Sequence, residues 1–133
     1  MELPKVCECQ IHDEYLTVSE EDSVLSIAKL FRNNRGIRHI MVVDEQQILK
    51  GIISLSDIVT KVVAENLDPS TVKARDVMET NVITVNENDT IDKVFMLMGK
   101  YKFIILPVVD SQRKLKGVIS LHDVLSKVRE IRG

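Results

Sequence analysis

The sequence predicts an α/β (α+β) fold made of two similar β-α-β-β-α repeats, packed against each other with pseudo-two-fold symmetry. Three observations predict it. The chain repeats itself, β-rich runs alternate with amphipathic helical patterns, and repeats of about 60 residues are small for independent cores, so we expect the two to pack face to face.

The internal repeat is the strongest of these observations. Residues 42–62 align with residues 108–128 at an offset of 66, and 13 of the 21 aligned positions are identical. Upstream the match continues at an offset of 67, which places a one-residue insertion or deletion near the turn-like residues 33–36. We therefore assign residues 1–67 to repeat 1, 68–74 to a linker and 75–133 to repeat 2.

Each repeat begins with a short strand and an amphipathic helix. The strand is followed by an acidic segment, and acidic side chains favour a helix N-terminus. Apolar residues then recur at the i, i+3, i+4, i+7 spacing of a helix with one buried face. The predicted strands are residues 15–18 and 82–85, and the predicted helices are residues 24–31 and 91–98.

A β-hairpin and a second helix complete each repeat. Two β-rich runs are separated by a polar turn, which is typical of a hairpin. Pro69 is then expected to end the last helix of the first repeat. The predicted strands are residues 40–43, 51–53, 104–109 and 117–119, and the closing helices lie near residues 58–63 and 124–131.

Composition excludes several classes of protein. The net charge of −2 and the scarcity of aromatic residues disfavour a nucleic-acid partner. No apolar run approaches the ~20 residues that span a bilayer, and residues 1–5 do not resemble a signal peptide, so we expect a cytoplasmic protein without a membrane partner. Cys7, Cys9 and His12 supply only three ligands of a zinc site, which favours reduced thiols and no metal.

One motif occurs intact in both repeats. Gly51-x-x-Ser54-x-x-Asp57 recurs as Gly117-x-x-Ser120-x-x-Asp123, where a strand ends and a helix begins. The first interpretation is a capping box, in which the serine caps the helix and the aspartate reaches back. The second is a nucleotide site, because the same helix end attracts phosphate and a carboxylate accepts hydrogen bonds from ribose hydroxyls.

The repeated unit resembles a CBS domain, and the pair resembles a stand-alone CBS tandem, or Bateman module. The resemblance covers nearly the whole chain. It is carried by residues 76–78 (DVM), 81–85 (NVITV), 106–110 (LPVVD) and 117–123 (GVISLHD), and in the first repeat by residues 36–44 and 51–57.

The resemblance implies a regulatory, non-catalytic module that binds an adenosyl ligand in clefts between the repeats. AMP, ADP or ATP is expected first, and S-adenosylmethionine or NAD are further candidates. Asp57 and Asp123 are then expected to hold ribose hydroxyls, and Ser54 and Ser120 to contact phosphate, with His122 beside them. Adenine is expected against Thr17, His39 and Met41 in the first repeat, and against Asn81, Val82, Thr84, Ile105 and Pro107 in the second.

The two repeats differ in the expected adenine pocket. Met41 stands where the second repeat has Pro107, and residues 6–11 replace the Asp-Val-Met lead of residues 76–78. We therefore expect either two sites or a preference for the second.

Further expectations concern partners and rival functions. We expect a homodimer that signals to a regulated protein whose identity the sequence does not give. The alternative is a ligand-free dimeric scaffold in which the serine and aspartate serve only as helix caps. An enzyme that uses Asp57 and Asp123 as paired carboxylates is disfavoured, because duplication puts them in separate sites.

Overall fold

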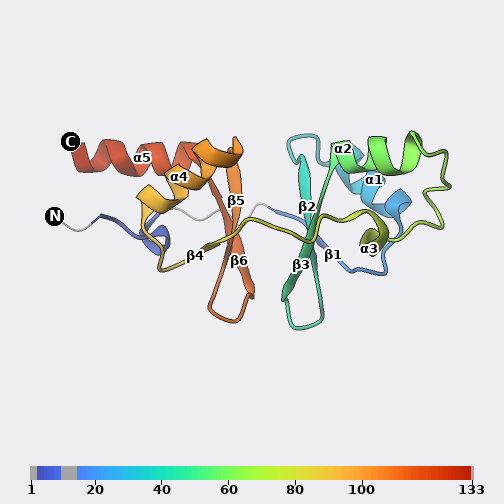
Figure 1. Ribbon diagram of the computed structural model, residues 1–133, viewed down its shortest axis with the longest axis horizontal. Helices are drawn as coiled ribbons and strands as arrows, with labels where there is room; N and C mark the ends of the chain where they lie inside the picture. The colour runs from blue at the N-terminus through green and yellow to red at the C-terminus, as the bar shows by residue number, and fades with distance from the viewer. Residues whose placement is uncertain (1–2, 10–14, 133) are drawn as a thin grey trace. The chain divides into compact units, whose positions relative to one another are not determined.

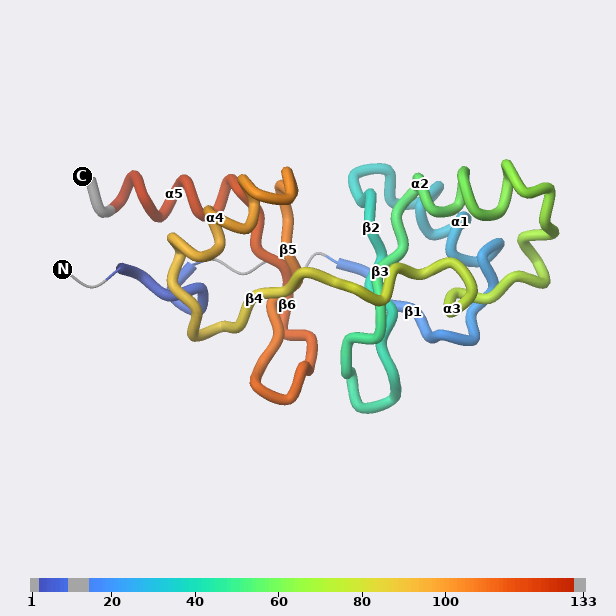
Figure 2. The backbone as a smooth tube through the Cα atoms, in the orientation of Figure 1, coloured from blue at the N-terminus to red at the C-terminus, as the bar shows by residue number. Residues whose placement is uncertain are grey.

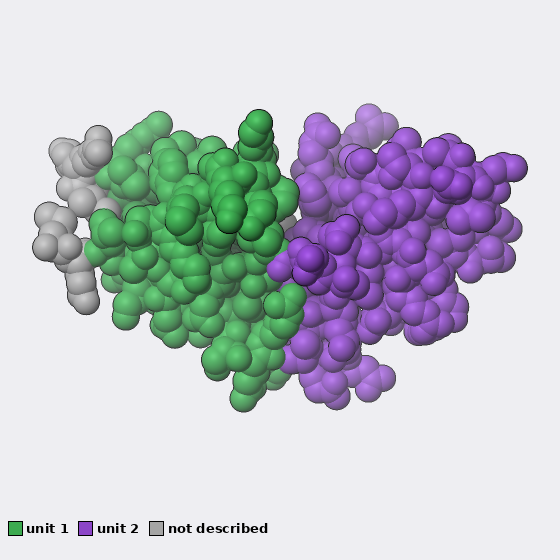
Figure 3. Space-filling view, viewed as in Figure 1, with its two compact units in different colours: residues 1–14, 83–133 green, residues 15–82 purple. Residues whose placement is uncertain are grey.

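The computed structural model describes residues 3–9 and 15–132, and His12 lies outside these ranges. The chain forms two compact units, drawn in Figure 1 and coloured separately in Figure 3. The β1–β3 unit contains residues 15–82, and the β4–β6 unit contains the N-terminal residues together with residues 83 onward. These units differ from the sequence repeats in two places. The N-terminal segment belongs to the unit of the second repeat, and residues 75–82 belong to the unit of the first.

The β1–β3 unit is a three-stranded mixed sheet with its helices on one side (Figure 1). Strand β1 runs parallel to β2, and β2 runs antiparallel to β3. Ser23 caps α1 by accepting a hydrogen bond from the Ser26 amide at 3.1 Å. The elements are β1 (Thr17–Val18), α1 (Val24–Asn33), β2 (His39–Val43), β3 (Leu49–Ser54), α2 (Leu55–Ile58), the π-helical turn η2 (Val59–Val63) and α3 (Ala74–Val77).

The β4–β6 unit repeats this arrangement. Its sheet has the order β4-β5-β6 with the same parallel and antiparallel pairs. The predicted β-α-β-β-α fold is therefore confirmed in both repeats. The elements are the 3₁₀ turn η1 (Val6–Glu8), β4 (Val85–Asn86), α4 (Ile91–Tyr101), β5 (Ile105–Val109), β6 (Leu115–Ser120) and α5 (Leu121–Arg132). No helix in the described part of the chain is long and apolar enough to cross a membrane.

Each unit has its own apolar core on the helix side of its sheet. In the β1–β3 unit, Ile40, Val42 and Ile53 are fully buried and pack with the apolar face of α1. Because side chains alternate along a strand, the intervening residues of β2 and β3 face the opposite side of the sheet. The core of the β4–β6 unit is built in the same way and includes Val85, Val94, Leu106, Val108, Ile119 and Val124.

The two hairpins share one turn structure. Asp44 Oδ1 accepts hydrogen bonds from the amides of Gln46 and Ile48 at 2.9 and 3.0 Å. Asp110 Oδ1 does the same for Gln112 and Lys114, at 2.9 Å each. The occurrence of an aspartate at this position in both repeats is thus explained by turn formation, since a carboxylate that accepts from backbone amides stabilises the hairpin turn.

Strands β1 and β4 begin two and three residues later than the strands predicted at 15–18 and 82–85. In the first unit the Met41 amide donates to the Leu16 carbonyl at 3.1 Å, which extends the pairing of β1 with β2. Pro107 stands at the position of Met41 and has no amide hydrogen, so it cannot donate the corresponding bond. Thr84, the counterpart of Thr17, therefore lies outside β4, and residues 82–83 precede the strand as residues 15–16 precede β1.

Two short segments have exchanged partners relative to the sequence repeats (Figure 2). Residues 3–9, at the start of repeat 1, pack on the β4–β6 unit, and α3, at the start of repeat 2, packs on the β1–β3 unit. Three backbone hydrogen bonds attach each segment, and they correspond in pairs. The N-terminal segment is attached by Val6 N to Asp89 O (2.7 Å), Cys7 N to Glu87 O (2.8 Å) and Ile91 N to Pro4 O (2.9 Å). The segment of α3 is attached by Ala74 N to Asp22 O (2.8 Å), Arg75 N to Glu20 O (3.1 Å) and Val24 N to Val72 O (2.8 Å).

Candidate functional site

Ser54 and Asp57 form a complete capping box at the start of α2. The Asp57 amide donates to Ser54 Oγ at 3.1 Å, and the Ser54 amide donates to Asp57 Oδ2 at 2.8 Å. The Ser54 hydroxyl also donates to Asp57 Oδ2 at 3.0 Å. Lys61 Nζ lies 3.1 Å from Asp57 Oδ1. A carboxylate has about four acceptor positions, and these contacts use three of them, so Asp57 retains one for a further donor.

Ser120 and Asp123 form the same box at the start of α5. The Asp123 amide donates to Ser120 Oγ at 3.1 Å, and the Ser120 amide and hydroxyl donate to Asp123 Oδ2 at 3.0 and 2.8 Å. Asp123 is only 7% exposed. The capping interpretation of the repeated motif is therefore confirmed in both units, and its binding interpretation stays a prediction.

In the β1–β3 unit, three of the predicted adenine contacts lie beside the motif. His39 is the cross-strand partner of Ser54, and Met41 is the partner of both Ile52 on β3 and Thr17 on β1. Directly opposed residues share a sheet face, so His39, Met41 and Ser54 lie on the face that does not pack on the helices. Thr17 is exposed, His39 is half-buried and Met41 is buried.

The predicted adenine contacts of the second repeat fall in two units. Ile105 is the cross-strand partner of Ser120, and Pro107 is the partner of Val118, on the face opposite to the core. Thr84 is half-buried and precedes β4 in the same unit. The structure assigns Asn81 and Val82 to the β1–β3 unit instead, so it does not bring this predicted set together within one unit.

The charge of His39 is linked to its position beside the motif. Burial lowers the pKa of His39 below its usual value of 6.5, because the uncharged imidazole is favoured away from water. The carboxylate of Asp57 acts in the opposite direction, and Arg38 adds to the lowering. His39 therefore tends to be neutral at pH 7. The second unit has Ile105 at this position and cannot change its charge there.

The absence of a side chain at Gly51 allows residues 78–79 of the same chain to pack closely against its backbone. A Cβ atom at Gly51 would lie 2.7 Å from Met78 Sδ and 2.9 Å from the Glu79 carbonyl. Residues Ile52 and Glu79 exchange two backbone hydrogen bonds of 3.0 and 2.9 Å next to this contact. This glycine of the motif therefore serves the packing of the segment that follows α3.

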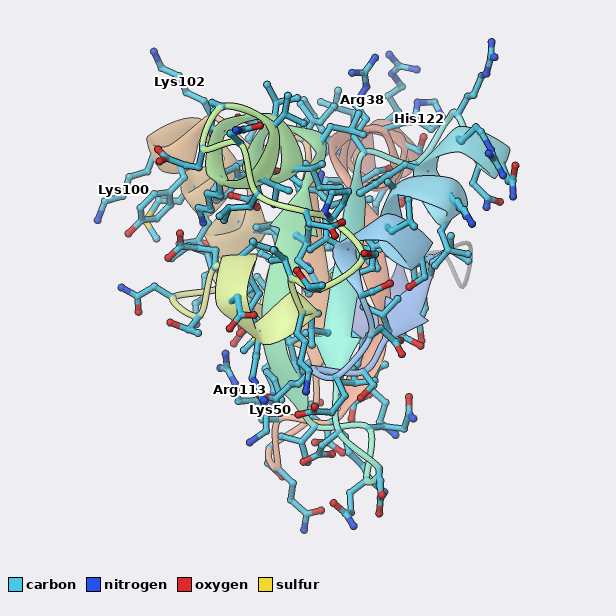
Figure 4. All side chains as sticks on the ribbon, turned by 90° about the vertical axis from the view of Figure 1, so that its right-hand side faces the viewer. Arg38, Lys50, Lys100, Lys102, Arg113 and His122 are labelled. Carbon is cyan, nitrogen blue, oxygen red and sulfur yellow. The ribbon has the colours of Figure 1, made fainter. Side chains whose placement is uncertain are left out.

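His122 is exposed in the first turn of α5, adjacent to Asp123 (Figure 4). Ser56 stands at its position in the first repeat. Figure 4 also labels Arg38, which directly precedes β2 and whose carbonyl accepts a hydrogen bond from the Leu55 amide at 3.3 Å. His122 thus lies two residues after Ser120, and the Arg38 backbone is bonded to the residue that follows Ser54. An imidazole and a guanidinium are both groups that bind phosphate.

Two pockets lie away from the repeated motif. One, of about 680 Å³, is bounded by Cys7, Lys127 and Glu130 in the β4–β6 unit. The other, of about 460 Å³, is bounded by acidic residues after β1 and by Arg75. Among the described residues, no group of three or more histidine, cysteine or acidic side chains is placed to hold a metal ion.

The family of the chain follows from comparison with known sequences. The CBS domain family matches residues 7–64 and 74–130, which together make up most of the chain. The chain belongs to the CBS domain family. The tandem of CBS domains predicted from the repeated motif is therefore confirmed.

Curated relatives place CBS pairs in proteins of several kinds. The chain is 35% identical over 112 residues to an uncharacterized protein of Methanopyrus kandleri, covering 84% of this chain and 57% of the relative. It is 34% identical to the magnesium transporter MgtE of Thermus thermophilus, covering 84% of this chain and 24% of the transporter. It is also 34% identical to an L-aspartate semialdehyde sulfurtransferase of Methanocaldococcus jannaschii, covering 82% and 20%. In each case the match spans less than two thirds of the relative, and for the enzyme only a fifth.

Solved structures of CBS proteins include complexes with adenosyl compounds. The cytosolic domain of the Mg²⁺ channel MgtE in complex with ATP is 32% identical, with a TM-score of 0.75 over 87% of this chain and 46% of that one. The CBS domain pair of protein MJ0100, in complex with 5′-methylthioadenosine and S-adenosyl-L-methionine, is 29% identical, with a TM-score of 0.75 over 99% and 100%. A hexameric CBS-CP12 protein from cyanobacteria is 26% identical, with a TM-score of 0.71 over 94% and 68%. The chain is thus similar to CBS pairs that bind nucleotides or S-adenosylmethionine.

Proposed function

We propose that this protein is a regulatory module that binds an adenine nucleotide, AMP, ADP or ATP, at the Ser54–Asp57 and Ser120–Asp123 motifs. The observation that carries the proposal is the duplicated serine–aspartate pair, whose serine lies opposite His39 in the β1–β3 unit and opposite Ile105 in the β4–β6 unit. The similarity to CBS pairs in complex with ATP and with S-adenosylmethionine supports it.

The hydrogen bonding of the motif gives the binding a specific chemistry. The single hydroxyl hydrogen of Ser54 is donated to Asp57, so Ser54 can donate to a phosphate only if that hydrogen turns away from the carboxylate. Turning it frees an acceptor position on Asp57 for a ribose hydroxyl. The phosphate contact and the ribose contact therefore favour each other. A ligand that carries both groups is expected to gain more binding free energy than the sum of the two contacts made separately.

Pro107 supports a preference for the second repeat. In the first unit the Leu16 carbonyl accepts from the Met41 amide, and Pro107 cannot make that bond to Ile83, the residue at the position of Leu16. The Ile83 carbonyl therefore retains acceptor capacity that suits the amino group of adenine. Guanine carries a carbonyl oxygen in place of that amino group, so the same position disfavours it.

The module acts through a partner and is not catalytic in this proposal. A ligand that binds two conformations with different affinity shifts their populations, and a regulated protein detects the shift. The module forms a homodimer through apolar side chains that the units leave exposed on their helices. These are Val59 and Val63 in the β1–β3 unit and Phe95 and Met96 in the β4–β6 unit.

The test is thermal unfolding and calorimetric titration with AMP, ADP, ATP, S-adenosylmethionine and NAD, with GTP as the control. A ligand present at 100 times its dissociation constant stabilises the folded state by ~2.7 kcal/mol. We expect such a shift with at least one adenine nucleotide and none with GTP. Absence of binding to every adenosyl compound would leave the ligand-free scaffold as the function.

Two variants and a matched control assign the site. Asp57→Asn and Asp123→Asn keep an oxygen that accepts from the serine amide and remove the charge and part of the acceptor capacity. Each is expected to weaken binding at its own site at least tenfold. Asp44→Asn makes the same chemical change in a hairpin turn, and it should leave the affinity unchanged.

A further inference from the structure

Residues 3–9 form a segment that we call the N-terminal strap. It packs on the β4–β6 unit as α3 packs on the β1–β3 unit, with corresponding backbone hydrogen bonds. The buried side chains correspond as well. Val6 and Cys9 of the strap are 0% and 8% exposed, and Ala74 and Val77 of α3 are 0% and 3% exposed. The apolar attachment of the two segments is therefore similar.

The electrostatic attachment of the two segments differs. Glu21 pairs with Lys73 at 2.7 Å and also with Arg75, which ties the first turn of α3 to the segment before α1. The hydrogen bond from Lys73 lowers the pKa of Glu21, as expected for a carboxylate that is paired when charged. At the corresponding positions of the β4–β6 unit, Asn88 replaces Glu21 and Cys7 replaces Arg75. An amide and a thiol do not form that ion pair.

The end of the strap lies close to the candidate binding motif. Burial raises the pKa of the Cys9 thiol, and the charges of Lys127 and Asp123 both act on it. Cys9 also packs in the core that contains Val124, the residue after Asp123. The strap and the first turn of α5, which carries the aspartate of the motif, therefore contribute side chains to one apolar core.

We propose that the N-terminal strap is a releasable element, which opens from the β4–β6 unit while the rest of the unit stays folded. Opening exposes the apolar surface under Val6 and Cys9 and loosens the start of α5. Ligand bound at Ser120 and Asp123 favours the closed strap, a coupling that rests on the proposed function. The population of the open strap then depends on ligand binding, because bound ligand lowers that population and opening of the strap lowers the affinity for the ligand.

The opening is measured by the rate at which N-ethylmaleimide modifies Cys9 in the Cys7→Ser variant, where it is the only thiol. Local opening exposes little surface, so the rate should depend only weakly on urea, whereas global unfolding gives a steep dependence. A matched reporter is Val77→Cys in the Cys7→Ser/Cys9→Ser background, which places a thiol at the equivalent position of α3. We expect Cys9 to react faster than this reporter. A modification rate of Cys9 that follows global unfolding overturns the proposal.

Transfer of the ion pair tests the cause. Cys7→Arg with Asn88→Glu copies the pair of Arg75 and Glu21 onto the strap. We expect it to slow the modification of Cys9 roughly two- to fivefold, the effect of an exposed ion pair on an opening equilibrium. Glu21→Asn should speed modification of the α3 reporter by a similar factor. No change in either rate contradicts an electrostatic origin.

The coupling to ligand is tested with AMP or ATP, whichever calorimetry shows to bind. Saturating nucleotide should slow the modification of Cys9 at least threefold in the protein with an intact motif and leave it unchanged in Asp123→Asn. Binding without a change in rate refutes the coupling and leaves the proposed function intact. A strap that opens locally in a protein that binds no nucleotide refutes the proposed function and leaves the strap intact.

Discussion

Lys61 joins the carboxylate of Asp57 to the end of α3: its ammonium lies 3.1 Å from Asp57 Oδ1 and donates to the Val77 carbonyl at 2.9 Å. We predict that Lys61→Met destabilises the protein by about 1 kcal/mol, a modest value because the Lys61 side chain is 40% exposed. Urea unfolding measures it. Lys93→Met is the control, since Lys93 makes an i,i+4 pair with Asp89 at 3.2 Å. Equal losses in the two variants would show that the carbonyl bond adds nothing.

Gly51→Ala is predicted to destabilise the protein by about 1–3 kcal/mol. The new Cβ would lie within 2.9 Å of the Glu79 carbonyl, and backbone yields less readily than the end of a side chain. Thermal unfolding measures the loss. The control is Gly99→Ala in α4, where a Cβ meets nothing within 4 Å, and it should stabilise the helix by about 0.5–1 kcal/mol. A neutral Gly51→Ala would contradict the close packing of residues 78–79.

His39 is predicted to make stability depend on pH below neutrality. Its pKa in the folded protein is lower than 6.5, so the unfolded chain binds the proton more readily. The contribution of His39 to stability is therefore complete above about pH 6.5 and falls as the pH drops below it. Unfolding free energies measured between pH 5 and pH 8 should decline less steeply in His39→Gln. The same decline in both proteins would exclude His39, and His122→Gln provides an exposed control.

Loss of exposed apolar side chains is predicted to weaken the proposed homodimer. Val59 and Val63 are 57% and 67% exposed on η2, and each buried aliphatic side chain contributes about 1.5–3 kcal/mol. Val59→Lys with Val63→Lys should shift the dimer toward monomer in sedimentation experiments. Thr60→Lys adds a charge on the same turn without removing an apolar group, and it should have a smaller effect. Unchanged association in the double variant would exclude this surface.

Periodicity made most of the fold predictable. The apolar spacing of residues 24–31 and 91–98 marks one face of a helix, and those faces pack in the two cores. The hairpins were predictable because β-rich runs flank polar turns, although the strands extend beyond the runs by one or two residues at most of their ends. The late start of β4 was also within reach, since Pro107 lacks the amide hydrogen that a paired strand needs.

The exchange of the short segments was not predicted. A segment of four or five residues buries only two side chains, which gives no periodic signal. A sequence signal did exist. Residues 5–9 (KVCEC) and 73–77 (KARDV) have the same pattern at an offset of 68, with a lysine first, an acidic residue fourth, and apolar residues second and fifth. The candidate binding motif was found from repetition, and its capping bonds followed from spacing alone. The partnership of His39 with Ser54 required the strand register, which the sequence does not state.

The crossed attachment of the strap and α3 bears on how such a chain arose. In this chain the segment at the start of each repeat covers the core of the unit built from the other repeat. A single repeat would therefore leave its own core uncovered at that place. An ancestor with one repeat would therefore have needed two molecules that lent each other their leading segments. Gene duplication and fusion would then have turned a contact between molecules into one within a chain. Separate expression of residues 1–67 and 68–133, which keeps α3 and its N-cap in the second fragment, should accordingly give fragments that fold better together than alone.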